Sequence, residues 1–382
     1  MRSAWGTAVA AVACGVLALA GCAQPAEPAA EEAAEGWQQV AAGPLSPREQ
    51  ALGLWTGREV LLIGGSDAPP CPPNASCAVN PAPLTDAAAL DPATGLWRPI
   101  AAPPAPVLGA QGVVIGSTVY VLPYQPRAAL LGYRVDQDKW SQLAAPPTFT
   151  GGYGLVAAGD RLVAYSGSDE NGPDRDYLFD PATKKWTALP DDPLGAGFDR
   201  HLAWGGRELL LFDHKLVPNP NADGPALTRV AALDLDRGTW RKLPDLPMLS
   251  TGPWLAAGAE LVNPTLGGAD GGQVGNWGRT YPLGGILDPA TGKWSALPDP
   301  PGGEGVRSAA RTGDAALYPG LVEVVLSTSS RTWEKVSAPP GGDTTGETVV
   351  AAGARMVVFG GARWKGEEGK LLNATRIWTP AG

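Results

Sequence analysis

The chain has 382 residues, of which 44% are hydrophobic and 18% charged, and its formal net charge at pH 7 is −9. No cluster of Lys and Arg stands out, which argues against nucleic acid as a partner, because neutralising phosphates requires a concentrated basic surface. The 51 Gly, 39 Pro and 14 Trp favour many short strands joined by turns. This length fits two or three ordinary domains or one large all-β unit.

Residues 1–21 are typical of an export signal. Arg2 provides a short basic region, and the apolar run that follows, about residues 8–20, is too short for a membrane-spanning helix. The run ends in "LAGC" at Cys22, which resembles the lipobox of bacterial lipoproteins. The resemblance implies cleavage before Cys22, a lipid on its thiol, and an extracytoplasmic protein anchored to the bacterial cell membrane. The alternative is an ordinary secretory signal in which Cys22 occurs by chance.

Residues 22–35 are predicted to form a flexible acidic tether. They contain four Glu and no large apolar side chain, so they cannot bury enough surface to become ordered. The folded domain is then expected to comprise residues 36–382.

Two cysteines remain after the signal and the lipid site, Cys71 and Cys77 in "CPPNASC". An even, closely spaced pair in an exported protein predicts a local disulfide. The alternative is two free thiols. A metal site would need two more soft ligands nearby, and the sequence shows none.

One phrase recurs along the chain, in which a large apolar residue is followed by six residues and then a Trp. Turn formers such as "DPATG" lie between the two, and a Pro-rich break follows soon after the Trp. The phrase therefore predicts the end of one strand, a tight turn and the start of the next. The pairs are Leu90/Trp97, Tyr133/Trp140, Phe179/Trp186, Leu233/Trp240, Leu287/Trp294 and Leu326/Trp333.

A second hairpin, with a glycine at its turn, precedes each copy of the phrase, and a last one follows them. Successive turns are 40 to 59 residues apart, at Gly57, Gly116, Gly159, Gly206, Gly258, Gly313 and Gly353. Each period thus carries four antiparallel strands, which is typical of a β-propeller blade. We therefore expect an all-β fold, a seven-bladed β-propeller with four antiparallel strands per blade.

The chain ends inside a seventh copy of the phrase. The segment "RIWTPAG", residues 376–382, stops before the strand that would carry the Trp. The segment "GWQQVAAGP", residues 36–44, has the missing Trp strand without the one before it. We expect the N-terminal strand around Trp37 to complete the last blade, because this closure ties the termini together and leaves no open edge.

The apolar–Trp frame, with Gly-Gly before it at residues 64–65 and 360–361, resembles the kelch repeat over residues 36–382. The resemblance implies a propeller of kelch type, like that of galactose oxidase. Most copies lack the double glycine, and Tyr is replaced by Leu or Phe in all but one. The copper site of that enzyme uses two Tyr, two His and a Cys crosslinked to one Tyr. Here the only histidines are His201 and His214, so we expect no copper site, and we predict no metal or cofactor.

Half of the tryptophans occupy one fixed position in the repeat, and we predict that they pack between adjacent blades. These are Trp37, Trp97, Trp140, Trp186, Trp240, Trp294 and Trp333.

In a propeller, the loops between second and third strands lie on one face around the central channel. The insertions fall in these loops, at residues 66–83, 167–176, 214–228, 265–281 and 362–372. Long loops on a rigid scaffold concentrate binding residues, and the aromatic and cationic candidates are Trp277, Arg279, Arg363 and Trp364. The alternative for Trp277 and Trp364 is that they cap the propeller beneath the loops.

A second group of candidates precedes the first strand of some blades and is predicted to reach the channel mouth. It comprises Arg48, Arg200, His201 and Arg307. Arg binds carboxylates bidentately, which would suit an acidic glycan or a peptide terminus. The alternative is that these arginines pair with Asp and Glu of neighbouring loops.

From these features we expect a membrane-tethered, non-catalytic module that binds protein or carbohydrate at the cell surface. The sequence shows no Ser-His-Asp constellation, metal motif or phosphate loop, so an enzyme is disfavoured. The main alternative is a carbohydrate-active enzyme such as a kelch-type sugar mutarotase or epimerase that uses Arg and Glu in the channel. A purely structural envelope component is the third.

Overall fold

The computed structural model describes residues 36–72, 75, 77, 83–148, 152–170, 172, 174–216, 225–265, 280–298, 310–312, 315–318, 324–328, 330–337, 339–342 and 344–380. Ala34–Gly382 form one compact unit. The predicted signal peptide, the tether and Cys22 lie outside the described residues. Within these ranges every regular element is a strand, and no helix has the length and apolar character needed to cross a membrane.

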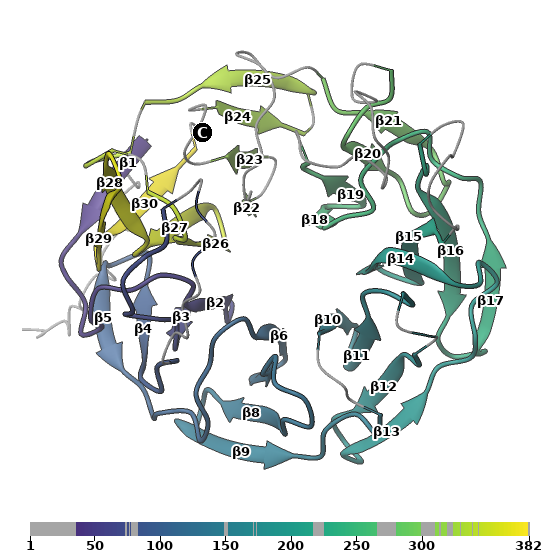
Figure 1. The fold of residues 1–382 in the computed structure, drawn as a ribbon, viewed down its shortest axis with the longest axis horizontal. Helices are drawn as coiled ribbons and strands as arrows, with labels where there is room; N and C mark the ends of the chain where they lie inside the picture. Colours follow the sequence, from purple (N-terminus) through teal and green to yellow (C-terminus); the bar gives the residue numbers. More distant parts are fainter. Residues whose placement is uncertain are drawn as a thin grey trace, which may run out of the picture. The chain divides into compact units, whose positions relative to one another are not determined.

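The strands form four-stranded antiparallel sheets, the blades of a β-propeller (Figure 1). The first three sheets are β2 (Leu52–Trp55), β3 (Val60–Ile63), β4 (Ala87–Asp91) and β5 (Leu96–Pro99); β6 (Gln111–Ile115), β7 (Thr118–Leu122), β8 (Leu130–Arg134) and β9 (Lys139–Leu143); and β10 (Tyr153–Ala158), β11 (Arg161–Ser166), β12 (Tyr177–Asp180) and β13 (Lys185–Ala188).

The next three follow the same pattern. They are β14 (Gly197–Trp204), β15 (Leu209–Lys215), β16 (Arg229–Asp234) and β17 (Thr239–Lys242); β18 (Leu255–Ala257), β19 (Glu260–Asn263), β20 (Gly285–Leu287) and β21 (Trp294–Ala296); and β22 (Ala310–Thr312), β23 (Ala315–Tyr318), β24 (Val324–Ser327) and β25 (Thr332–Lys335).

The last sheet joins the two ends of the folded unit. It contains β26 (Thr348–Ala352), β27 (Arg355–Phe359), β30 (Thr375–Thr379) and, at its outer edge, the N-terminal β1 (Gly36–Val40). Trp37 lies directly opposite Trp378, and Trp378 lies opposite Met356 on β27. The predicted closure by the N-terminal strand is therefore confirmed.

The innermost strands of successive sheets contact one another around the ring. Strand β2 contacts β6 and β26, β10 contacts β6 and β14, and β22 contacts β18 and β26. Between β14–β17 and β18–β21 the link is a shared core, in which Leu210 and Phe212 cluster with Leu261 and Leu287. The sheets thus pack face to face around a common centre (Figure 1).

The repeated phrase forms the outer hairpin of every sheet but the last, as predicted. All six apolar–Trp pairs are directly opposed on the third and fourth strands, for example Leu90 with Trp97 and Phe179 with Trp186. The Asp that begins "DPATG" caps its own turn, since Asp91 Oδ1 accepts a 2.8 Å hydrogen bond from the amide of Ala93. Short-range turn chemistry therefore sets the register of this hairpin.

In the described residues, every boundary between neighbouring sheets, here called a seam, except the one between β14–β17 and β18–β21 is bridged by a hydrogen bond from a repeat Trp. Six of these Trp donate from Nε1, over 2.7–3.1 Å, to a backbone carbonyl in the sheet before them. The acceptor is always four residues beyond the Trp of that preceding sheet. The bonds are Trp37 to Ser337, Trp97 to Ala41, Trp140 to Ala101, Trp186 to Ala144, Trp240 to Pro190 and Trp333 to Pro298. These half-buried side chains thus pack and hydrogen-bond across the seams.

Glycine on an inner strand permits close approach of two sheets. A Cβ added to Gly53 on β2 would lie 2.3 Å from Val350 Cγ2 and 2.5 Å from Thr348 Cγ2, both on β26. We expect Gly53→Ala to lower the free energy of unfolding by about 1–3 kcal/mol because the core is overpacked, as measured by urea unfolding. The matched control is Gly167→Ala, since the nearest atom to a Cβ there is 4.0 Å away. Equal stability of the two variants would contradict this packing.

Candidate functional site

The connections between second and third strands lie on the same face as those between successive sheets, because an antiparallel four-stranded sheet returns the chain to that side. We call this the loop face. Backbone bridges join the two kinds of connection, as when Ser66, after β3, pairs with Glu49 before β2 and with Pro83 before β4. The predicted insertions thus share one face with the connections between sheets, which makes it the natural place to seek a binding site.

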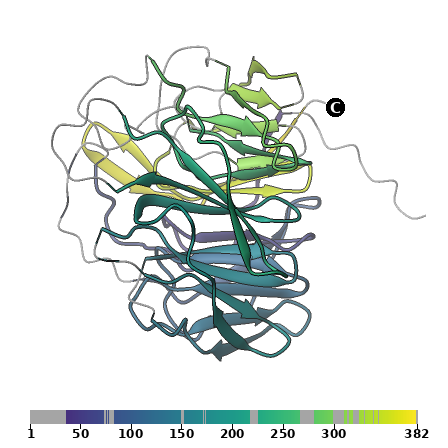
Figure 2. The ribbon, with the colours of Figure 1, turned by 90° about the vertical axis from the view of Figure 1, so that its right-hand side faces the viewer.

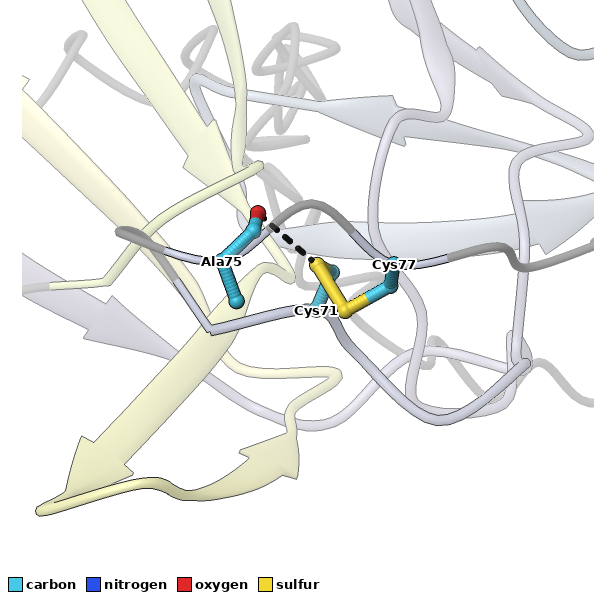
Figure 3. The surroundings of a disulfide bond; sticks show 3 residues. All are labelled: Cys71, Ala75 and Cys77. Carbon is cyan, nitrogen blue, oxygen red and sulfur yellow. Dashed lines mark hydrogen bonds between the residues drawn. A yellow bond between two sulfur atoms is a disulfide. The ribbon is translucent and has the colours of Figure 1, made fainter.

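The first insertion contains the predicted disulfide, which is confirmed. Cys71 and Cys77 are bonded, with their Cα atoms 5.8 Å apart. Cys71 Sγ lies 3.3 Å from the carbonyl oxygen of Ala75 inside the loop (Figure 3). This is a close contact and not a donated bond, because a disulfide sulfur carries no proton. The covalent closure limits the conformations open to this segment of the loop face.

The insertion at residues 362–372 was predicted as a loop, and it contains a hairpin instead. Strands β28 (Ala362–Lys365) and β29 (Glu368–Leu371) pair with each other in a separate two-stranded sheet. The hairpin projects from the ring on the loop face (Figure 2). Sequence reasoning missed it because the segment "ARWKGEEGKLL" has little apolar alternation; its "KGEEGK" turn was the available signal.

Trp364 fastens this hairpin to the ring. Its Nε1 donates a 2.7 Å hydrogen bond to Thr345 Oγ1. A Cβ added to Gly369 would lie 2.6 Å from Trp364 Cη2 and 2.8 Å from Pro70 Cγ, so the hairpin also contacts the disulfide loop. Trp364 therefore occupies the capping position that was its alternative, while the neighbouring Arg363 is exposed.

Arg48 is surrounded by polar groups of the connections before β2 and between β3 and β4. Its guanidinium is fully buried and donates to both carboxylate oxygens of Asp86, at 2.6 and 2.8 Å. Further donations reach the carbonyls of Ser46 and Gly64 at 2.9 and 3.0 Å. For the arginines predicted near the channel, the alternative was pairing with acidic residues of neighbouring loops, and Arg48 forms such a bidentate pair with Asp86. The pair holds the start of β2 against the connection before β4.

Arg200 has the same character, although it lies within β14 and not before it. Its side chain is 3% exposed and bonds to Asp176 Oδ2 at 3.0 Å and to Asp192 Oδ2 at 3.3 Å. It also donates to the carbonyl of Ser166 at 2.8 Å. Because Ser166 and Asp176 belong to the preceding sheet and its loop, Arg200 links two sheets across a seam. Arg229 forms a comparable pair with Asp213, at 2.7 and 2.8 Å, which the sequence analysis did not single out.

Next to Arg200, a bulge between Phe198 and His201 brings both histidines close to Asp199. The Nδ1 atom of His201 lies 3.2 Å from the Asp199 carbonyl and 3.1 Å from Thr251 Oγ1. The buried His214 places Nδ1 3.5 Å from Asp199 Oδ2, and this neighbour lowers the pKa of Asp199. Neither ring nitrogen of His214 has a hydrogen-bond partner in the described part of the chain.

This cluster predicts that acid destabilises the fold through His201. Burial lowers the pKa of His201, so the unfolded state binds its proton more readily, and stability is lost as the pH falls below about 6.5. We expect the melting temperature to drop between about pH 7.5 and 5.5 by less in His201→Gln than in the wild type. Burial raises the pKa of Asp213 to about 6, so Asp213 favours the folded state as the pH falls. This contribution is the same in the wild type and in His201→Gln, so it cancels when the two are compared. An equal drop in both would refute the role of His201.

The structure brings only some of the predicted site residues together. Arg363 and Trp364 are consecutive on β28, and Arg200 and His201 are consecutive on β14. Three others, Trp277, Arg279 and Arg307, lie outside the described residues. In the ranges that the structure describes, no three His, Cys, Asp or Glu side chains gather closely enough to hold a metal ion.

Comparison with known proteins does not assign the chain to a family. No protein-family model matches it, and no curated protein matches it in sequence.

Proposed function

We propose that the protein is a seven-bladed propeller of kelch type, with one blade for each four-stranded sheet. The kelch assignment is supported by the apolar–Trp pair on the third and fourth strands, which recurs in the same register in six of these sheets. We further propose that a lipid on Cys22 anchors it outside the cytoplasm, on the strength of the "LAGC" sequence.

The anchor has a direct test. Cys22→Ser removes the thiol that would carry the lipid, so the full-length variant is expected to move from the membrane fraction to the soluble fraction of its host cell. Arg2 and the apolar run stay intact, which keeps export itself unchanged. A variant that stays with the membrane would contradict lipid anchoring at Cys22.

On this scaffold we propose that the protein acts as a non-catalytic module that binds a partner protein through the loop face. The observation that carries this proposal is the β28–β29 hairpin, a projection held in place by Trp364 and by contact with the disulfide loop. Its exposed side chains carry both signs of charge, at Arg363, Lys365, Glu367, Glu368 and Lys370. A rigid surface of mixed charge suits paired polar contacts with another protein, at low cost in ordering.

Two other functions find less support in this geometry. A glycan platform needs an exposed aromatic face, whereas Trp364 is half-buried and its indole N–H is used by Thr345. A mutarotase would need free arginines in the channel, whereas Arg48 and Arg200 each have a carboxylate partner. The partner-binding proposal therefore uses the residues that the fold leaves available.

Site-specific photo-crosslinking in the intact cell tests the proposal. A photoreactive amino acid is placed in the full-length, membrane-anchored protein at Lys365, on the hairpin, or at Lys139, on the outer strand β9. We expect a discrete protein adduct from position 365 and none from position 139, because only the first lies on the loop face. The same adducts from both positions, or none from either, would overturn the proposed function.

A further inference from the structure

A cavity of about 400 Å³ opens between the sheets β2–β5 and β6–β9. Its walls come from the three loop-face connections that precede β4, β6 and β8, and from strands β8 and β9. Pro83 ends the disulfide-containing connection, Pro106 lies between the sheets, and Pro123 begins the connection between β7 and β8. We propose that this cavity binds a small, uncharged and mainly apolar molecule, a function separate from the partner binding proposed above.

The size and lining of the cavity favour such a ligand. Small-molecule sites commonly enclose about 300–1,000 Å³ and are mostly apolar, with a few polar groups that orient the ligand. Here the lining residues are three Pro, three Ala, one Leu and two Gln, and none is charged. A charged ligand would lose its hydration without gaining an ionic partner, so the lining selects against charge.

Two glutamines are the polar residues of the lining. Gln125 lies in the connection after β7 and Gln142 on β9, and both are exposed. Neither carboxamide is engaged in a hydrogen bond within the described residues, so each is available to donate to and accept from a ligand. An uncharged ligand with one carbonyl, hydroxyl or amine group would fit this arrangement.

Tyr124 adds an aromatic group next to two lining residues, Pro123 and Gln125. It is 62% exposed, and the only other exposed large hydrophobic residue in the described ranges is Leu96. Its Cβ and Cε2 atoms lie 3.8 Å from the positions that a Cβ would take at Gly109 and Gly152. The side chain therefore lies against the glycines that precede β6 and β10, at the rim of the same connection, and it is not itself part of the cavity lining.

Because the cavity is lined by β8, β9 and the connections that precede β4, β6 and β8, its ligand should stabilise the folded state where the first two sheets meet. A molecule that binds only the folded state raises the melting temperature in proportion to the logarithm of its concentration, once that exceeds the dissociation constant. Probe affinity and the shift in melting temperature are thus two linked readouts of binding to the folded state.

The test uses two fluorescent probes with the same ring system. N-phenyl-1-naphthylamine is uncharged, and 8-anilinonaphthalene-1-sulfonate carries a negative charge. We expect the folded protein to bind the uncharged probe at least about tenfold more tightly than the sulfonate, and the uncharged probe to raise the melting temperature. Equal affinity for the two probes, or binding without a rise in melting temperature, would overturn the proposal.

Two variants locate the binding. Ala129→Phe fills the cavity, and Gln142→Glu brings a charge to its wall; each is expected to weaken binding of the uncharged probe by at least about tenfold. Gln142 is exposed, so its variant keeps the fold and decides the matter if Ala129→Phe does not fold. The matched controls are Gln39→Glu on β1 and Leu96→Ser on β5, both exposed and outside the cavity. Unchanged affinity in Gln142→Glu, or a loss of binding in Leu96→Ser, would refute the assignment.

Discussion

Replacing Trp186 with alanine is expected to lower the free energy of unfolding by about 3 kcal/mol. The Trp186 ring packs 4.9 Å from that of Phe179 and against a core shared with Tyr120 and Leu122 of the preceding sheet. Its Nε1 also donates a 2.7 Å hydrogen bond to the Ala144 carbonyl across the seam. Truncation removes both contributions, and urea denaturation of residues 36–382 measures their sum.

Phenylalanine separates the hydrogen bond from the packing. Trp186→Phe keeps an aromatic ring and removes the donor to the exposed Ala144 carbonyl, which water can then reach, so we expect a loss of about 0.5–1.5 kcal/mol. Trp294 is the matched control, because its buried Nε1 has no partner in the described part of the chain. Trp294→Phe is therefore expected to be less destabilising than Trp186→Phe. The reverse order would show that the indole bonds do not hold the seams.

Replacing Arg200 with methionine is expected to cost about 3–5 kcal/mol of stability, because it leaves a buried carboxylate without its partner. Asp176 is only 8% exposed. Burial raises its pKa, and Arg200 acts against that shift. Without Arg200 the protonated carboxyl is favoured further, so the variant should recover part of its stability on acidification. Urea denaturation at two pH values measures both effects.

Arg241→Met provides the comparison for a surface pair. Arg241 bonds to Glu208 at 2.6 Å, and its side chain is 49% exposed, so we expect a loss of about 0–1 kcal/mol. A double variant, Arg200→Met with Asp176→Leu, should be more stable than Arg200→Met alone because no buried charge remains. If Arg200→Met kept full stability, Arg200 would be free for the ligand-binding role first predicted for it.

The blade is the part of the fold that the sequence predicts best. The apolar–Trp frame and its Asp-Pro turn are local signals, and they give the strand pairs directly, as with Leu90 and Trp97. The closing pair of Trp37 and Trp378 is distant in the chain. It was predictable because the last copy of the phrase, at residues 376–382, lacks its Trp strand, and residues 36–44 supply one.

The loop face was less predictable, because its contacts join residues that no repeat relates. The sequence marks Arg48 and Arg200 as cations near the channel, but their partners Asp86 and Asp176 lie at the ends of two connections of unequal length. The cavity beside Tyr124 likewise depends on how two sheets meet. The short segment "PYQP" offered an exposed aromatic as a signal, but its connection was not among the long insertions.

Ring closure by β1 is the claim on which the seams and the shared loop face both depend, and removing that strand tests it most directly. A chain of residues 45–382 lacks β1 and the Ala41 carbonyl that accepts the Trp97 hydrogen bond. Its melting temperature, compared with that of residues 36–382, should be lower and should rise again when a synthetic peptide of residues 36–44 is added. The same melting temperature for both chains, with no response to the peptide, would contradict the closed ring.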